Sequence, residues 1–307
     1  MRKIPHRNII SIGERTIMPK NYSFLRFPGF KLRALTFSFD DGMVEDVWLV
    51  NLFKQYGLKG TFNLNSCAFD VEEPKPNHIG RCRLSKMQLV ELFKDSGMEV
   101  AVHGVHHLSL AEMPTTTMIQ DVLNDRIKME NAFGTIINGM AYANGSFSDE
   151  AVEVLRLCGI KYARTVESTL KFDIPKDWLR MPATCHYKND KLMDLADAFL
   201  TDYPKDLHYI KRLPRLFYVW GHSYEFRENN NFGKMQAFAE KMGASDAIWN
   251  ATNIEVYNYV KAFDNLVYSA NEKYVYNPSG LDVYLCWFGK DVLVPAGQTV
   301  ELPYNGY

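Results

Sequence analysis

Two clusters of acidic and imidazole side chains stand out in this sequence of 307 residues. Asp40 and Asp41 form the first cluster, directly after a short β-rich run and before a glycine. The second cluster places His103, His106 and His107 within five residues. Imidazole and carboxylate together are a normal ligand set for zinc, and two histidines four residues apart reach one ion if the segment winds into a turn. The two clusters therefore predict a divalent-metal site.

A third cluster follows the apolar run at residues 216–220 and contains His222 and Glu225. Because an unperturbed histidine titrates near neutral pH, His222 is a candidate for proton transfer, and Glu225 is placed to orient it or to touch substrate. Each cluster alone has an ordinary explanation, since acids are common in turns and a single histidine is often a hydrogen-bonded core residue. All three together favour a metal-dependent catalytic site.

The elements that must position these side chains alternate between β-rich and amphipathic helical runs, as in a parallel sheet or barrel. About eight strand–helix units are predicted, with strands at residues 35–39, 60–64, 99–102, 136–141, 161–165, 179–183, 216–220 and 247–250. The predicted helices are 44–56, 85–93, 115–132, 148–157, 191–200, 231–241 and 254–263. In barrels the chemistry lies at the C-terminal ends of the strands, so the three clusters are expected to meet there.

From about Lys273 the pattern changes to strands and turns only. Fewer than ~40 residues cannot bury an adequate core alone, so this part is expected to pack on the barrel. We therefore predict an α/β protein with a distorted (β/α)7–8 TIM-like barrel over residues 1–272. A small C-terminal β-strand extension, a β-meander appendage, would occupy residues 273–307.

The charges nearly cancel, because 35 Lys and Arg against 36 Asp and Glu give a formal net charge of −1. This balance excludes a polyanion binder that works by bulk charge, so no nucleic-acid partner is expected and a neutral or weakly charged substrate is favoured. No run approaches the ~18 to 20 apolar residues of a membrane span. The basic start of the chain lacks the apolar core of a signal peptide, so we expect a cytoplasmic protein, with export of a longer precursor left open.

From about residue 35 to 266 these motifs resemble the polysaccharide deacetylases with NodB homology, carbohydrate esterase family four. The family motif T-F-D-D-G reads S-F-D-D-G at residues 38–42, which implies that Asp40 is the catalytic base and Asp41 a metal ligand. The second motif, with two ligands four residues apart, implies His103 and His107, and leaves His106 as a bystander or alternative ligand. The family's fold is a distorted barrel of about seven β/α units.

The family's remaining motifs match less uniformly. Its last motif, Leu-x-His, implies that His222 is the general acid. In the third motif this chain has Ala141 where an arginine usually orients the base, and Asn144 where an aromatic residue lends its backbone N–H to the oxyanion. A backbone donor survives a change of side chain, so the oxyanion role is assigned to Asn144. Arg180 is predicted to supply the missing cation from a neighbouring strand.

The residues and the resemblance agree on one mechanism. One divalent metal, zinc with cobalt or nickel as alternatives, is held by Asp41, His103 and His107 and polarises the acetyl carbonyl. Asp40 takes a proton from the attacking water, and His222 protonates the leaving group. The predicted enzyme is a hydrolase of non-peptide carbon–nitrogen bonds that removes an acetyl group from an N-acetylated or O-acetylated carbohydrate.

Aromatic and polar side chains that follow strands are the candidates for binding the sugar at the rim. These substrate-binding candidates are Tyr142, Trp178, His186, Tyr224 and Glu225. Two other functions remain open: a metal-dependent amidase acting on a small non-carbohydrate amide, and a non-catalytic carbohydrate-binding relative. The sequence predicts no oligomeric state.

Overall fold

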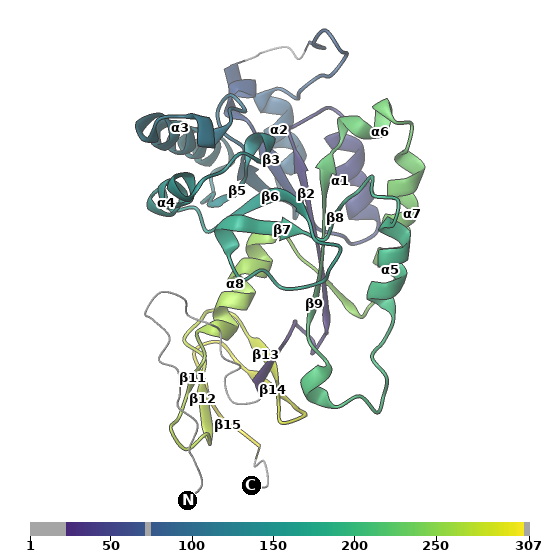
Figure 1. Ribbon diagram of the computed structural model, residues 1–307, viewed down its shortest axis with the longest axis vertical. Coiled ribbons are helices and arrows are strands. Elements are labelled where there is room, and N and C mark those ends of the chain that lie inside the picture. The colour runs from purple at the N-terminus through teal and green to yellow at the C-terminus, as the bar shows by residue number, and fades with distance from the viewer. Residues whose placement is uncertain (1–22, 71–74, 304–307) are drawn as a thin grey trace, which may run out of the picture.

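The computed structural model describes residues 23–70 and 75–303 (Figure 1). The prediction made from the basic start of the chain lies outside these residues. The centre of the molecule is one parallel sheet of nine strands, in the order β7-β6-β5-β4-β3-β2-β9-β8, with β10 beside β2. The strands are β2 (Arg33–Asp40), β3 (Thr61–Leu64), β4 (Glu99–Val102), β5 (Gly139–Ala141), β6 (Tyr162–Ser168), β7 (Met181–Ala183), β8 (Cys185–His186), β9 (Arg215–His222) and β10 (Ile248–Asn250).

The two ends of this sheet come from one stretch of chain. β7 and β8 are separated by Thr184 alone, yet β7 pairs with β6 while β8 pairs with β9. The sheet therefore curls round until both of its edges meet the segment 181–186, as a distorted barrel requires. Counting that segment once leaves seven β/α strands with β10 as an addition, which agrees with the predicted fold class.

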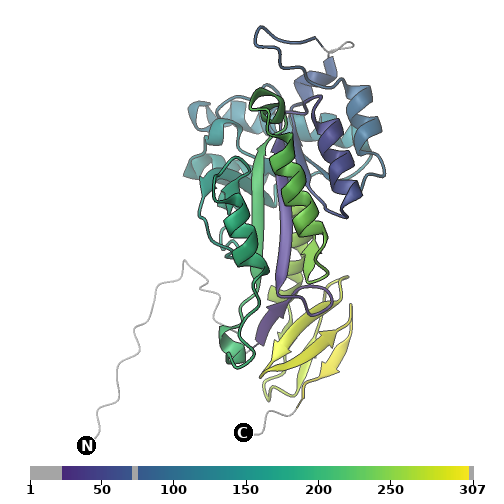
Figure 2. The ribbon, with the colours of Figure 1, turned by 90° about the vertical axis from the view of Figure 1, so that its right-hand side faces the viewer.

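In the described residues, eight α-helices lie between the strands and cover the outside of the sheet, and the turned view shows α5 and α7 over the long strands β2 and β9 (Figure 2). They are α1 (Asp46–Gln55), α2 (Lys86–Phe93), α3 (Thr115–Phe133), α4 (Asp149–Leu157), α5 (Leu192–Leu200), α6 (Tyr224–Glu228), α7 (Phe232–Gly243) and α8 (Asn253–Asp264). Short 3-10 turns are η1 (Ser66–Asp70), η2 (Leu110–Glu112), η3 (Ala143–Gly145), η4 (Trp178–Arg180) and η5 (Tyr209–Lys211).

The sequence explains why these elements begin where they do. α2 starts at the predicted cap Ser85, whose hydroxyl accepts from the Gln88 backbone while the Gln88 side chain accepts from the Ser85 backbone. Such a capping box satisfies two backbone donors that the first helical turn leaves free. β2 is buried along its whole length because sheet neighbours flank it and helices cover it, as central strands of α/β sheets are.

The C-terminal part forms two small sheets on the barrel, β1-β13-β14 and β11-β12-β15, drawn mostly in yellow in Figure 1. Their strands are β1 (Ser23–Arg26), β11 (Val267–Tyr268), β12 (Tyr274–Tyr276), β13 (Val283–Trp287), β14 (Lys290–Val294) and β15 (Thr299–Glu301). Ala262 and Leu266, at the end of α8 and just after it, lie in the same buried cluster as Trp287. The appendage thus packs on the barrel through α8, while the boundary between residues 272 and 273 stays a prediction.

The sequence missed β1, which joins the appendage from the other end of the chain. β1 pairs antiparallel with β13, so that Phe24 faces Cys286. A strand of four residues is too short to give a detectable periodicity, and only its distant partner defines it. Among the described helices, none is both long and apolar enough to cross a membrane.

Candidate active site

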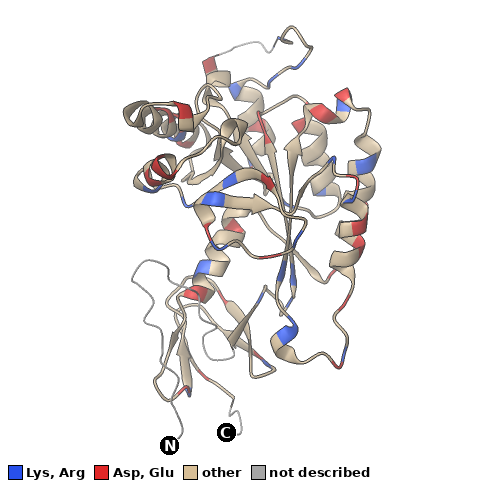
Figure 3. Cartoon of the chain, in the orientation of Figure 1, with Lys and Arg blue, Asp and Glu red and all other residues tan. Residues whose placement is uncertain are grey.

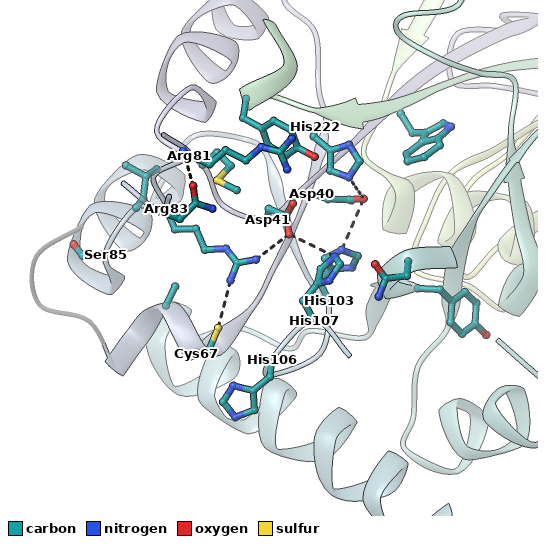
Figure 4. Close-up of a pocket in the computed structure, with 18 of the residues that line it drawn as sticks. Asp40, Asp41, Cys67, Arg81, Arg83, Ser85, His103, His106, His107 and His222 are labelled. Atoms are coloured by element: carbon teal, nitrogen blue, oxygen red, sulfur yellow. Dashed lines mark hydrogen bonds and ion pairs between the residues drawn. The ribbon is translucent and has the colours of Figure 1, made fainter. Parts of the chain in front are cut away.

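The C-terminal ends of the central strands bring the predicted residues together in one cavity (Figure 4). Asp40 ends β2 and lies opposite His222 of β9 in the sheet register. His103 comes directly after β4. The cavity has a volume of about 810 Å³. Parallel strands deliver their C-terminal ends to one side of the sheet, so residues far apart in sequence meet here.

Asp40 is a buried carboxylate held in its ionised form. Its Oδ2 pairs with the guanidinium of Arg164, and its Oδ1 accepts a hydrogen bond of 2.8 Å from Asn63 Nδ2. Burial alone would raise the pKa of Asp40, but the charge and hydrogen bond of Arg164, together with His103 and His222, outweigh burial and lower the pKa to about 2. His103 Nε2 and His222 Nε2 lie 3.9 and 3.8 Å from Asp40 Oδ2. The carboxylate oxygen therefore stands between two imidazoles.

The cation beside Asp40 is Arg164 of β6, so the prediction of Arg180 is wrong. Arg164 is fully buried, and its guanidinium carbon lies 4.5 Å from the centre of the Trp220 ring. Arg180 instead pairs with Asp149 at 2.5 Å and Asp177 at 2.6 Å, outside the cavity lining. The sequence did contain a signal for Arg164, because it is the one arginine inside the predicted strand 161–165 and a charge buried in a strand needs a partner.

Asp41, His103 and His107 form the candidate metal site. Their ligand atoms all lie within 4.8 Å of one another. His103 Nδ1 is 2.8 Å from the Ala141 carbonyl, so it donates there and leaves Nε2 as the bare nitrogen. His103 Nε2 is buried and has no hydrogen-bond partner among the described residues. A buried lone pair beside the Asp41 carboxylate and a second imidazole fits a divalent cation.

The backbone around these ligands adopts conformations that are costly for ordinary residues. Asp41 has φ +82° and His107 has φ +57°, both in the left-handed region. Such conformations cost on the order of 1–3 kcal/mol and cluster at functional sites. Gly104 also has a positive φ, and a Cβ there would come within 2.8 Å of Asp121 Oδ2. Both the positive φ and the nearby Asp121 favour glycine at position 104.

Two buried acids of α3, which the sequence reading missed, hold the histidine segment from behind. Asp125 accepts from the backbone N–H of Ser66 at 2.9 Å and of His103 at 3.1 Å. Asp121 accepts from the Val105 backbone at 3.2 Å. Burial raises the pKa of Asp125 to about 6. The two acids occupy positions four residues apart in a predicted helix, a spacing that places both on one face.

His222 lies between two acids. Its Nδ1 is 3.7 Å from Glu225 Oε2, on the side away from Asp40. Burial lowers the pKa of His222, but the neighbouring Glu225 and Asp40 outweigh burial and raise it. Burial likewise acts to raise the pKa of Glu225, while contacts with His186, His222 and Lys188 hold it well below its usual range. This histidine is therefore poised to carry a proton.

The predicted rim residues divide into two groups. Tyr142, Asn144 and Tyr224 line the cavity, whereas Trp178, His186 and Glu225 are not among its lining residues. Trp178 is buried in the core against the Tyr257 ring at 5.2 Å, so its substrate-binding prediction is wrong. Trp178 lies in η4, directly before β7 and not at the C-terminal end of a strand, so the sheet does not carry its ring into the cavity.

His186 and Glu225, the other two predicted residues that do not line the cavity, contact each other beside His222. Glu225 accepts from Lys188 at 2.7 Å and lies 3.2 Å from His186 Nε2. Glu225 therefore matches the first of its two predicted roles, which is to orient His222, and the cavity lining gives the substrate-binding prediction for His186 no support. Asn144 lies in η3 with φ +56°, and its side chain donates to Ser109 Oγ at 3.1 Å. His106 also lines the cavity, apart from the three candidate ligands (Figure 4).

The family model described as polysaccharide deacetylase matches residues 29–163, which confirms the resemblance seen in the motifs. This stretch contains both aspartates and the histidine cluster, and it ends one residue before Arg164. No curated protein matches the chain.

Several solved structures are similar to this chain. A putative polysaccharide deacetylase from Mycobacterium smegmatis has TM-score 0.53 and 14% identity, over 79% of this chain and 95% of that chain. A family 4 carbohydrate esterase from Streptomyces lividans in complex with acetate has TM-score 0.46 and 15% identity, over 71% and 90%. A deacetylase from Streptococcus pyogenes in complex with acetate has TM-score 0.38 and 19% identity, over 43% of this chain and 55% of that one. This chain thus aligns with just over half of the streptococcal protein, and the mycobacterial likeness supports the α/β fold.

Proposed function

We propose that this protein deacetylates an N-acetylated or O-acetylated carbohydrate with one divalent metal. The premise is the match of residues 29–163 to the polysaccharide deacetylases, which are hydrolases that act on acetyl amides and esters. One observation carries the proposal. The Asp40 carboxylate lies 3.9 Å from a candidate ligand, His103, and 3.8 Å from a candidate acid, His222. A base between a cation site and an acid is the arrangement that hydrolysis of an acetyl group needs.

The candidate ligands would hold the metal, zinc by the nature of the donors, with cobalt or nickel as alternatives. When bound to Asp41, His103 and His107, the ion supplies a Lewis acid for the acetyl carbonyl and lowers the pKa of water. Asp40 accepts the proton of the attacking water at Oδ2, the oxygen nearest to both imidazoles. Arg164 keeps that oxygen ionised and fixed in direction.

His222 carries the second proton transfer in this proposal. It donates from Nε2 to the leaving nitrogen or oxygen, while Glu225 lies beside Nδ1. The backbone N–H of Asn144, at the cavity wall, is the proposed donor to the oxyanion. Tyr142 and Tyr224 also line the cavity, but both side chains are buried and Arg81 covers one face of the Tyr224 ring.

The size of the cavity favours a sugar over the small amide that the sequence left open. About 810 Å³ lies within the range of sites that enclose drug-sized ligands. A non-catalytic carbohydrate binder is the less favoured alternative, because binding alone would require neither the base Asp40 nor the acid His222.

Metal removal tests the proposal directly. Purified protein is dialysed against chelator and assayed on 4-nitrophenyl acetate and on an N-acetylglucosamine oligosaccharide, before and after zinc, cobalt or nickel is added back. We expect activity to vanish and then return, with one metal per chain by elemental analysis. His103→Gln should lose both metal and activity, whereas His208→Gln, on the distant η5 side, should keep both. Full activity of the metal-free protein would contradict the proposal, and turnover of small amides only would exclude the carbohydrate.

A further inference from the structure

We propose that the acetylated glycan carries a carboxylate, and that Lys75 and Arg83 bind it on a surface that Arg81 helps to shape; the three residues are here called the cationic wall. All three line the cavity that contains Asp40 and Asp41. This inference rests on the proposed function and specifies its substrate. It also departs from the sequence-based expectation of a neutral substrate, which came from the net charge of the whole chain.

The cationic wall belongs to the connection between η1 and α2, and a tight turn holds it in shape. Asn77 donates from its backbone to the Arg81 carbonyl at 2.8 Å and accepts from the Gly80 backbone at 2.9 Å. The Asn77 side-chain oxygen accepts from the backbones of Ile79 and Arg81 at 3.1 and 2.9 Å. An asparagine that bonds its own turn in this way fixes the loop, so the part of the wall that contains Arg81 is preformed.

A second set of contacts ties the turn to α6, next to the candidate acid. Arg81 donates twice to Glu228, at 2.7 and 3.0 Å, and its guanidinium carbon lies 3.6 Å from the centre of the Tyr224 ring. Arg227 donates to the Gly80 carbonyl at 2.9 Å. Arg81 is therefore neutralised by an ion pair, and its role is to shape the wall around Tyr224.

The charge that remains for a ligand comes from Arg83 and Lys75. Arg83 donates to Asp41 Oδ1 at 3.1 Å and contacts Cys67 Sγ at 3.5 Å, as Figure 4 shows. Asp41 is a candidate metal ligand, so a bound cation would share the carboxylate that neutralises Arg83. Lys75 is exposed and forms no ion pair among the described residues.

The cavity therefore differs in charge from the molecule around it. Its lining contains three lysine or arginine residues and two acids, and Asp40 is already paired with Arg164. Elsewhere both signs of charge are interspersed over the helices (Figure 3). Lysine and arginine therefore outnumber the acids of this lining, and a recess with an excess of one sign of charge concentrates ligands of the opposite sign. The flat guanidinium fork of Arg83 matches a planar carboxylate, which makes a uronic-acid type of sugar the fitting partner.

The first experiment compares two glycans that differ in this group alone. Zinc-loaded protein is titrated calorimetrically with an N-acetylated oligosaccharide containing uronic acid, and with the same oligosaccharide after its carboxyls are reduced to alcohols. We expect the acidic glycan to bind ~10-fold more tightly at low salt, with the advantage shrinking as sodium chloride is raised. Equal binding, or tighter binding of the reduced glycan, would overturn the inference. Tighter binding of a phosphorylated analogue than of the uronate would show that the group bound by the wall is not a carboxylate.

The second experiment locates the preference on the wall. Lys75→Gln, and the double variant Arg81→Gln with Glu228→Gln, should each reduce the ratio of the two affinities by about threefold, because each loosens or discharges the wall. Lys54→Gln on α1 removes the same charge from an exposed helix away from the cavity and should leave the ratio unchanged. If neither wall variant changes the ratio of the two affinities, the inference is wrong.

The two proposals fail in different ways. Zinc-dependent hydrolysis of 4-nitrophenyl acetate tests the deacetylase itself and needs no carboxylate. If that activity is absent while the acidic glycan still binds more tightly, the proposed function is wrong and the cationic wall is correct. If hydrolysis is present and the two glycans bind alike, only the wall is wrong.

Discussion

Two acids of the same barrel, Asp40 and Glu99, have opposite protonation behaviour. Asp40 ends β2 at the active site, and Glu99 begins β4 at the other end of the sheet. Burial acts to raise the pKa of both, yet the pKa of Asp40 falls to about 2 and that of Glu99 rises to about 7. Both carboxyls accept hydrogen bonds, so burial and hydrogen bonding alone do not explain the difference.

The decisive difference is a cation. Glu99 accepts from Tyr162 and Thr61 hydroxyls at 2.7 Å each and from the Ile254 backbone at 2.9 Å. None of the ion pairs among the described residues includes it, whereas Arg164 is paired with Asp40. A positive charge at contact distance favours the ionised acid, and Arg164 with the imidazoles of His103 and His222 together outweigh the desolvation of Asp40. Glu99 therefore ties β3, β6 and the start of α8 together, while Asp40 is kept ready to accept a proton.

The largest expected effect comes from removing the reactive acid. Asp40→Asn should lower kcat/KM by ~10²- to 10⁴-fold, because the amide cannot act as a general base. Elemental analysis should show the same metal content as wild type, since Asp41, His103 and His107 are unchanged. Glu99→Gln serves as the matched control and should retain most of the activity. Comparable activity of Asp40→Asn and wild type would break the assignment of the base.

The next effect tests the cation. Arg164→Met should lower the free energy of unfolding by about 3–5 kcal/mol, because it leaves the buried Asp40 charge without its partner. Arg180→Met removes an exposed arginine with two ion pairs and should cost only ~0–1 kcal/mol. Urea denaturation of the metal-free proteins measures both. A similar cost for the two variants would contradict the distinction drawn between the arginines.

A smaller effect concerns the positioning of the acid. Glu225→Gln removes the anion beside His222, so the pKa of His222 should fall. Since His222 must be protonated to donate, the alkaline limb of the kcat profile should move to lower pH, and kcat near neutral pH should drop by about tenfold. Glu240→Gln on α7 is the control with the same change of charge. An unmoved alkaline limb would assign Glu225 a purely structural role.

The smallest effect on activity, but a distinct one on stability, is expected at Glu99. In the folded protein the pKa of Glu99 is about 7, against an ordinary value of 4.5. Between these two values the folded state therefore binds more protons than the unfolded state. The free energy of unfolding should therefore fall as pH rises through this window, by on the order of 3 kcal/mol from this group. Glu99→Gln should abolish that share of the pH dependence. An unchanged slope would show that another group causes it.

Much of the fold was predictable because its causes are local. The strand at residues 99–102 and the cap Ser85 were predicted in place, since apolar spacing and capping chemistry act over a few residues. β1 and the Trp178 ring were not, because the partner strand and the direction of a side chain depend on distant segments. The partner of Asp40 was mispredicted for the same reason. Arg180 was chosen from its place in the sequence, whereas Arg164 reaches Asp40 from a distant strand.

The sequence alone determined the chemistry available to this protein. The order and spacing of the two aspartates and the histidines fix which donors exist, and strand ends in a parallel barrel fix that they share one side. Tertiary structure decided which charges meet. It paired Asp40 with a buried arginine, left Glu99 with hydroxyls, and set Arg83 and Lys75 on the cavity wall of a nearly neutral chain. Electrostatic energy depends on distance and burial, and neither quantity is written in the order of residues.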